Sequence, residues 1–280
     1  MGDWDGDGVP DLLVGSPGAD PGRGADAGRV EIVSGRDLST LHSIEGEREG
    51  DRLGSAAWGE ARREGHFLVI GAGKAGPARL GTAYLYRGAT PALLARISAD
   101  ESGGSLGESH VSLVGDVDAD GVPDFAISDW RNGARGRNTG RLSIHSGADG
   151  ALLRSFTGGN GEGLGCGDGV AGDADGDGHA DIVIGAWLSS RGASEGGAVF
   201  LYSGKSSELV ETWAGRTVGD HVGFDVTGIG DVDADGAGDY LITAASSSVS
   251  GRDTGRVFVV AGPKYFRRKG GKEAGGGGSR

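Results

Sequence analysis

The chain has 280 residues, 60 of them glycine, and a formal net charge of −13 at pH 7. Its single cysteine, Cys166, excludes an intrachain disulfide. No apolar run reaches the roughly 18 residues of a membrane-spanning helix, so membrane insertion is not expected. No secretory signal peptide is visible, because Met1 is followed directly by an acidic loop.

The chain begins with an acidic loop, residues 3–11, that runs directly into the apolar segment 12–15. Aspartates stand at positions 1, 3, 5 and 9 of this loop, and glycine stands at position 6. Calcium takes six to eight oxygen ligands, which carboxylates on a loop curled around the ion can supply. Glycine at position 6 permits the positive φ that the curl requires. The segment therefore predicts a calcium-binding loop followed by a strand.

The same acidic loop recurs at residues 116–124, 173–181 and 231–239, each time before an apolar strand. The carbonyl of position 7 can add a backbone ligand, and the aspartate of position 9 closes the shell. An EF-hand is excluded, because it needs flanking helices and a glutamate at position 12, where these copies have valine or isoleucine. Asp-Gly turns that bind no ion are the alternative, but four copies with the same aspartates argue against it. The predicted metal ligands are Asp3, Asp5, Asp7, Val9, Asp11, Asp116, Asp118, Asp120, Val122, Asp124, Asp173, Asp175, Asp177, His179, Asp181, Asp231, Asp233, Asp235, Ala237 and Asp239.

The negative charge of the chain comes from these loops, which hold 16 aspartates. It therefore carries little information about a nucleic-acid partner, and none is predicted. Clustered carboxylates repel one another without a cation, so metal binding should be coupled to folding.

The spacing of the loops indicates a repeat. Successive loops begin 113, 57 and 58 residues apart, so a further copy is expected near residue 60. Residues 59–67 precede the apolar segment 68–71 there, but Arg62 and Arg63 stand where the other copies have ligands. The sequence thus predicts up to four calcium ions, with no site in the second repeat.

Each repeat has the same predicted parts. A strand with a Leu-Gly or Val-Gly pair is followed by the acidic loop, an apolar strand, a long polar loop, a strand ending near Ser-Gly, and a fourth strand. Four short antiparallel strands per unit are typical of a β-propeller blade. The predicted fold is an all-β propeller of four-stranded antiparallel blades, with about five repeats of about 57 residues. The repeats run over residues 2–58, 59–115, 116–172, 173–230 and 231–262.

The two ends of the predicted propeller are irregular. The first repeat starts at its acidic loop and lacks a first strand, and the fifth lacks a clear fourth strand. Two hypotheses follow: an incomplete ring from a longer propeller whose upstream part is missing, or a five-bladed ring that closes imperfectly. Residues 263–280 are predicted to form a basic, Gly-rich disordered tail.

On these loops and strands, residues 2 to about 262 resemble the FG-GAP repeat of integrin α-subunit propellers and their bacterial relatives. The "FG" place holds pairs such as Leu53-Gly54 and Val222-Gly223, and the "GAP" place holds Gly15-Ser16-Pro17 in the first repeat. The resemblance implies that the calcium loops join the first and second strands of a blade on one face of the disc. An extracellular or cell-surface location is predicted as well, because calcium is abundant there and weak calcium sites are sufficient.

The loops between second and third strands should lie on the opposite face. They are long and polar, and they carry Trp130, Arg131, Trp187 and Arg191. Aromatic and arginine side chains on loops of a rigid scaffold favour binding of a protein or glycan ligand. A solvated set of loops with incidental arginines is the alternative.

Motifs for catalysis are missing from the sequence: we find no Gly-x-Ser-x-Gly, no P-loop and no His-Glu-x-x-His. The predicted function is a calcium-binding module for extracellular recognition or adhesion, without enzyme activity. One alternative is the propeller domain of a secreted, calcium-dependent lyase or hydrolase acting on carbohydrate. The other is a purely structural repeat of a larger surface protein.

Overall fold

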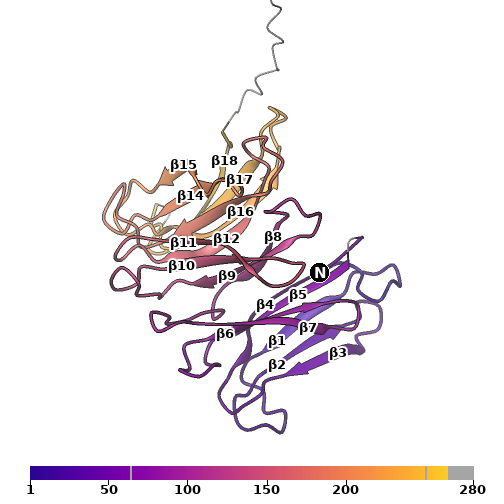
Figure 1. Ribbon diagram of the computed structural model, residues 1–280. Helices are drawn as coiled ribbons and strands as arrows, with labels where there is room; N and C mark the ends of the chain where they lie inside the picture. The colour runs from indigo at the N-terminus through magenta and orange to yellow at the C-terminus, as the bar shows by residue number, and fades with distance from the viewer. Residues whose placement is uncertain (64, 250, 264–280) are drawn as a thin grey trace, which may run out of the picture.

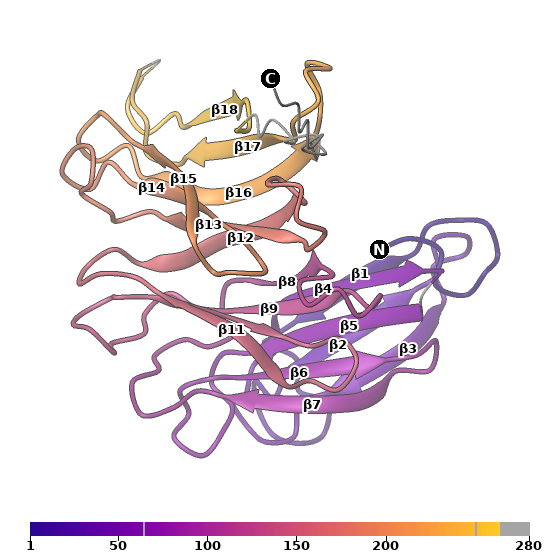
Figure 2. The ribbon, with the colours of Figure 1, turned by 45° about the horizontal axis from the view of Figure 1, so that its top comes forward.

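The computed structural model describes residues 1–63, 65–249 and 251–263. Five antiparallel sheets follow one another along the chain and around an arc (Figures 1 and 2), and the described residues contain no helix. The prediction of an all-β, propeller-like fold is confirmed. All but one residue of the predicted tail, 263–280, lie outside the described residues.

The first sheet holds β1 (Leu12–Ser16), β2 (Arg29–Val33) and β3 (Thr40–Glu45). The second holds β4 (Leu53–Arg62), β5 (Gly65–Ala72), β6 (Thr82–Arg87) and β7 (Ala92–Ser98). The third holds β8 (Val111–Gly115), β9 (Asp124–Asp129), β10 (Arg141–His145) and β11 (Leu152–Thr157). The fourth holds β12 (Leu164–Gly172), β13 (Asp181–Ala186), β14 (Ala198–Tyr202) and β15 (Leu209–Ala214). The fifth holds β16 (Val222–Gly230), β17 (Asp239–Ala244) and β18 (Arg256–Val260).

Within each sheet the strands pair in chain order. The three middle sheets have four strands, whereas the first sheet and the described part of the fifth have three. The first sheet lacks the strand that precedes the acidic loop in the third, fourth and fifth sheets, as the sequence predicts. A hollow of about 450 Å³ lies beside β1, lined by Leu12, Leu13 and Trp58 among others.

The core consists of apolar layers between neighbouring sheets. All six residues of β13 are buried, because the fourth sheet packs against a sheet on each side. Ile182 and Ile184 face the third sheet, and Val183 between them faces the fifth. Burying one such side chain contributes about 1.5–3 kcal/mol. A run of apolar residues without alternation is therefore the pattern expected for a middle strand.

Glycines bring neighbouring sheets into backbone contact. Gly140, just before β10, forms a bridge with Leu164 at the start of β12, and Gly197 does the same with Val222. A Cβ atom on Gly140 would lie 2.1 Å from the backbone nitrogen of Leu164, so no other residue fits there. Bridges at the two earlier sheet junctions pair Gly28 with Leu53 and Gly81 with Leu106.

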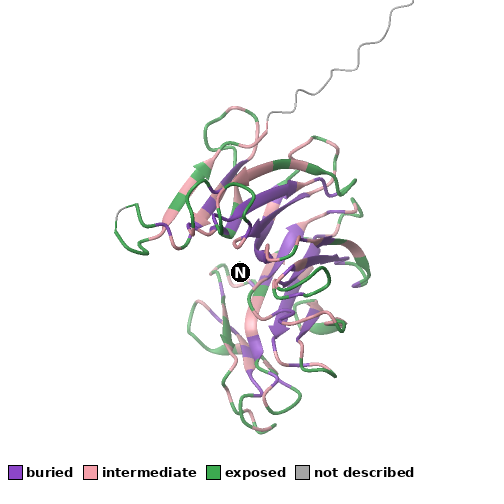
Figure 3. Ribbon diagram, turned by 90° about the vertical axis from the view of Figure 1, so that its left-hand side faces the viewer, coloured by how far each residue is buried: buried purple, intermediate pink, exposed green. Residues whose placement is uncertain are grey.

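The sheets form an open arc (Figure 3). Contacts between sheets run from β1 to β4, from β4 to β8, from β8 to β12 and from β12 to β16. In the described part of the chain, no contact of similar extent joins the first sheet to the fifth. Among the described residues, the ring of five sheets is therefore open between the first and the fifth sheet.

Candidate metal centres

The loop at residues 116–124 connects β8 to β9 and curls around its own carboxylates. Asp116 accepts hydrogen bonds from the backbone amides of Asp120 at 3.0 Å and Gly121 at 2.8 Å. Asp118 accepts a second bond from the Asp120 amide at 3.2 Å. Gly121 has a φ of +87°, which only glycine adopts without strain. These local bonds draw the carboxylates of positions 1 and 3 toward the centre of the loop.

The other acidic loops repeat this pattern. Asp173 accepts the amides of positions 5 and 6 at 2.8 and 3.0 Å, and Asp231 accepts them at 3.0 and 2.9 Å. In the first loop, Asp3 accepts the amides of positions 5 and 6 at 3.0 and 2.8 Å. The aspartate of position 1 therefore organises the backbone in all four loops.

Each loop gathers three aspartates whose carboxylate oxygens lie within 4.8 Å of one another. In three loops these are positions 1, 3 and 9, and in the first loop they are positions 1, 3 and 5. The predicted ligands at position 5 of the last three loops, and Asp11 in the first, lie outside these groups. An all-oxygen donor set of this kind fits a hard cation such as calcium. The four groups are Asp3, Asp5 and Asp7; Asp116, Asp118 and Asp124; Asp173, Asp175 and Asp181; and Asp231, Asp233 and Asp239.

The aspartate at position 9 is buried in every loop. Asp124 accepts the Val117 amide at 2.8 Å and the Gly147 amide at 2.9 Å. Burial raises its pKa to about 6, although these hydrogen bonds favour the ionised form. Burial likewise raises the pKa of Asp181 to about 6. A cation in the loop would offset this cost of holding a buried carboxylate in its charged form.

The contact between position 9 and a glycine explains the Ser-Gly sequence that ends the third strand. Gly147 follows β10, and a Cβ atom there would lie 1.9 Å from the carbonyl oxygen of Pro123. The sequence interpretation treated this glycine only as a strand end and missed its bond to Asp124. The detectable signal is the nearly constant separation of 23 or 24 residues between the two partners in all four loops.

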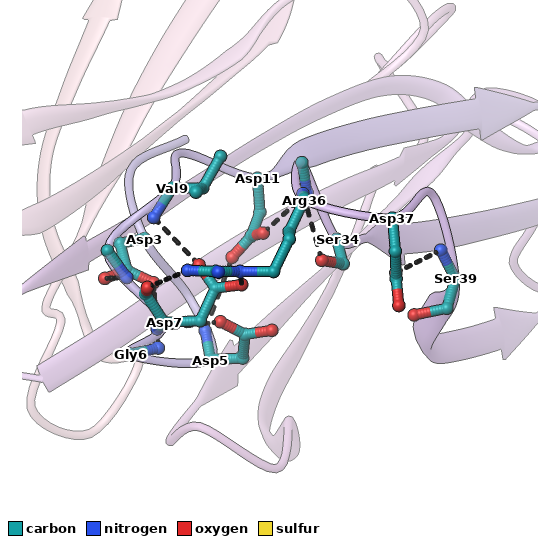
Figure 4. A network of polar contacts seen from close by, with 12 residues as sticks. Asp3, Asp5, Gly6, Asp7, Val9, Asp11, Ser34, Arg36, Asp37 and Ser39 are labelled. Atoms are coloured by element: carbon teal, nitrogen blue, oxygen red, sulfur yellow. Dashed lines mark hydrogen bonds and ion pairs between the residues drawn. The ribbon is translucent and has the colours of Figure 1, made fainter.

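A basic side chain, also missed from the sequence, contacts the first loop (Figure 4). Arg36 donates through Nε to the carboxylate of Asp7 and through its terminal nitrogen to the Asp7 carbonyl. The hydrogen bond from Arg36 is the main reason why the pKa of Asp7 lies below its ordinary value. Lys205 occupies the same place after its Ser-Gly pair and donates to the Asp177 carbonyl at 3.5 Å. The other two loops have alanine or proline at this position.

The acidic loops of the third and fourth sheets also contact each other. The ring of His179, at position 7 of its loop, places Nδ1 2.8 Å from the carbonyl oxygen of Val117 in the loop of the third sheet. The second sheet differs, because β4 and β5 form a hairpin in which Arg62 pairs with Gly65. Among the described residues of that hairpin there is no acidic group of the kind found in the loops.

At the opposite ends of the sheets, an aromatic cluster forms around Trp130 and Trp187, whose ring centroids lie 5.6 Å apart. The guanidinium of Arg131 lies 4.6 Å from the Trp130 ring. Trp187 also packs against His221 and Phe224, with ring centroids 5.1 and 5.6 Å apart, respectively. Trp130 directly follows β9, which begins at the acidic loop, so topology places the cluster on the face away from the aspartates.

The fourth predicted recognition residue, Arg191, has other partners. It donates to Glu162 at 2.9 Å and lies over the Phe200 ring at 4.7 Å. The structure therefore brings together three of the four residues that the sequence proposed for ligand binding.

Comparison with known proteins agrees with the fold. Residues 1–32 match the family model of the FG-GAP repeat, so the predicted resemblance is confirmed for that segment. Among solved structures, the chain is similar to Sqt1 of Saccharomyces cerevisiae, a β-propeller protein, with a TM-score of 0.51 and 14% sequence identity. The similarity covers 91% of this chain and 59% of that one, and it shows the fold alone. No curated protein matches the sequence. Among the described residues, no helix is long and apolar enough to cross a membrane.

Proposed function

We propose that the protein is a calcium-binding β-propeller module that recognises a protein or glycan outside the cell. The observation that supports calcium binding is the convergence, in all four loops, of three carboxylates within 4.8 Å. Like charges held so close destabilise the metal-free loop, and a divalent cation removes the repulsion. Oxygen ligands alone favour calcium or magnesium over zinc or copper.

Calcium bound in a loop would tie together parts of a blade. In the third sheet, Asp116 and Asp118 belong to the loop, whereas Asp124 is the first residue of β9. A cation shared by these three side chains fixes the connection between β8 and β9. Extracellular modules bind calcium with dissociation constants of about 0.1–1 mM, which are sufficient in that compartment. This proposal of location rests on the FG-GAP resemblance together with these loops.

Recognition is assigned to the cluster of Trp130, Arg131 and Trp187. Arg131 is half exposed and lies against an indole ring, and Phe224 beside Trp187 is 44% exposed. Aromatic and arginine side chains of this kind supply much of the binding energy at protein interfaces. We propose binding without catalysis, because the sequence carries none of the catalytic motifs Gly-x-Ser-x-Gly, P-loop or His-Glu-x-x-His.

Thermal unfolding tests the metal proposal. The full chain is melted in EDTA, in millimolar calcium and in millimolar magnesium. Calcium should raise the melting temperature well beyond magnesium, since one site saturated at 100 times its dissociation constant contributes about 2.7 kcal/mol. A folded metal-free protein that calcium does not stabilise would contradict calcium binding.

A separate experiment tests recognition. Wild-type protein and the variants Trp130→Ala and Arg131→Ala are applied in calcium to a glycan array and to cell-surface protein extracts. Both substitutions should weaken binding, whereas Arg252→Ala, at a side chain that is 94% exposed, should not. Undiminished binding by the Trp130 and Arg131 variants would show that the ligand binds at another site. Failure of the wild-type protein to bind any ligand would favour a purely structural repeat.

A further inference from the structure

In the part of the chain that the structure describes, one apolar face of the first sheet has no other sheet packed on it. Leu12 and Val14 of β1 are 49% and 40% exposed. The same two positions of the fourth sheet, counted from the acidic loop, hold Ile182 and Ile184, which are fully buried against the third sheet. The exposed face of the first sheet is therefore the kind of face that packs on a preceding sheet.

On the fifth sheet, the opposite kind of face has no sheet packed on it among the described residues. Val257 and Val259 of β18 are 58% and 62% exposed. Their counterparts in the fourth sheet, Val199 and Leu201, are fully buried against the fifth sheet. The two sets are equivalent because both strands begin after the glycine of a Thr-Gly or Gly-Gly pair and pair in the same register with the strand before them. This face is the kind that packs on a following sheet.

Both free faces are apolar or neutral at their centres. Beside Val259, the last sheet presents Leu241, which is its register partner in β17. On the first sheet, Leu12 lies opposite Val33, and the charge of Glu31 is matched by Arg29 at 3.3 Å. No unpaired charge on these central positions opposes the approach of another apolar sheet.

We propose that the two faces bind each other between copies of this chain, the last sheet of one copy packing on the first sheet of the next. The interface between the third and fourth sheets provides the template, in which Leu142 and Ile144 meet Ile182 and Ile184. A second copy is the occupant that fits, because the chain carries one face of each kind at the two ends of its arc (Figure 2). The proposal rests on apolar packing and does not depend on the metal loops or the aromatic cluster.

Such a contact is heterologous, since two different faces meet. Each added copy again presents one free face at either end, so association should continue head to tail as the protein concentration rises. A two-fold dimer would pair one face with the same face of the other copy, so its association would stop at two copies.

Sedimentation velocity of the full chain in calcium tests this proposal with two variants. Val14→Lys places a charge in the apolar face of the first sheet, and Val259→Lys does the same in the face of the fifth sheet. Wild-type protein should form a concentration-dependent series of oligomers, and each variant alone should be monomeric. An equimolar mixture of the two variants should form dimers and nothing larger, because one intact face of each kind remains.

Val218→Lys serves as the matched control, because Val218 is an exposed valine outside both faces. It should associate as the wild type does, and circular dichroism should show that all three variants are folded. A wild-type chain that stays monomeric at every concentration would overturn the proposal and would leave the two faces to further sheets of a longer chain. Variants that still associate singly, or a mixture that stays monomeric, would overturn it as well.

Discussion

The backbone amide of Gly147 donates a 2.9 Å hydrogen bond to Oδ1 of Asp124, 23 residues earlier in the chain. The bond ties the start of β9 to the turn after β10. The other oxygen of Asp124 accepts the Val117 amide inside the acidic loop, and the side chain has no exposed surface. Asp124 thus joins three parts of the blade even without a cation. The same link recurs as Asp11 with Gly35, Asp181 with Gly204 and Asp239 with Gly262.

Substitutions of Asp124 and Asp118 should consequently affect stability differently: the first should matter even without calcium, and the second only when calcium is bound. Asp124→Ala leaves buried amides without an acceptor and should lower the free energy of unfolding by about 3 kcal/mol even in EDTA. Asp118→Asn should leave the stability in EDTA unchanged or slightly raised, because it removes a carboxylate that Asp120 and Asp116 repel. It should instead reduce the stabilisation by calcium. Urea unfolding with and without calcium measures both effects, and equal losses in EDTA would contradict the distinction.

Gly147 should tolerate no side chain. Alanine at this position would place Cβ 1.9 Å from the Pro123 carbonyl, so the turn and β9 must separate. We expect Gly147→Ala to cost about 3 kcal/mol or more, as strained core substitutions do. Gly133→Ala is the matched control, because its nearest neighbours lie 3.6 Å away and its φ is not positive, and it should change stability by less than about 0.5 kcal/mol. Thermal melts that coincide for the two variants would show that the turn can yield.

The curl of the acidic loops could be predicted from the sequence because its hydrogen bonds are local. Asp173, for example, bonds to amides four and five residues ahead, so the spacing of Asp and Gly within one loop specifies it. The apolar strands and the missing first strand were visible for a similar reason, since a repeat of about 57 residues shows which part a copy lacks.

Contacts that depend on strand register or sheet packing could not be predicted from the sequence. Arg36 meets Asp7 across 29 residues only because β1 and β2 pair as they do. Arg191 is a residue type typical of ligand-binding surfaces, but in the folded protein it forms an ion pair with Glu162. The Trp130–Trp187 contact could be predicted in part. The two residues stand one repeat apart, and equivalent loops of neighbouring blades lie side by side.

Arg36 should weaken cation binding at the first loop. Its positive charge lies against Asp7, one of the three clustered carboxylates, and it would repel an incoming cation. Arg36→Ala should therefore raise the affinity of this loop several-fold. Terbium luminescence excited through tryptophan can report it, because Trp4 stands between Asp3 and Asp5. Arg252→Ala, on a loop of the opposite face, should leave the titration unchanged, and unaltered or weaker binding by the Arg36 variant would refute the proposed repulsion.

The contact between His110 and Asp225 should make stability depend on pH. Nε2 of His110, just before β8, lies 3.7 Å from Oδ1 of Asp225 in β16. Burial alone lowers the pKa of His110, but Asp225 and the nearby charge of buried Asp168 outweigh it, so the pKa lies above its ordinary value of 6.5. A group whose pKa is raised by folding stabilises the folded state fully below its unfolded value and loses that contribution as the pH rises through its folded value.

Asp225→Asn should therefore destabilise the protein most below pH 6.5 and progressively less as the pH rises past the raised pKa of His110. Because Asp225 is more than half exposed, the largest difference should be about 1 kcal/mol or less. Melting curves across pH for the wild type, Asp225→Asn, His110→Gln and the double variant form a double-mutant cycle that isolates the pair. In the His110→Gln background, Asp225→Asn should have an effect that no longer changes near neutral pH. A pH dependence that survives there would mean that another group, such as Asp168, titrates in this range.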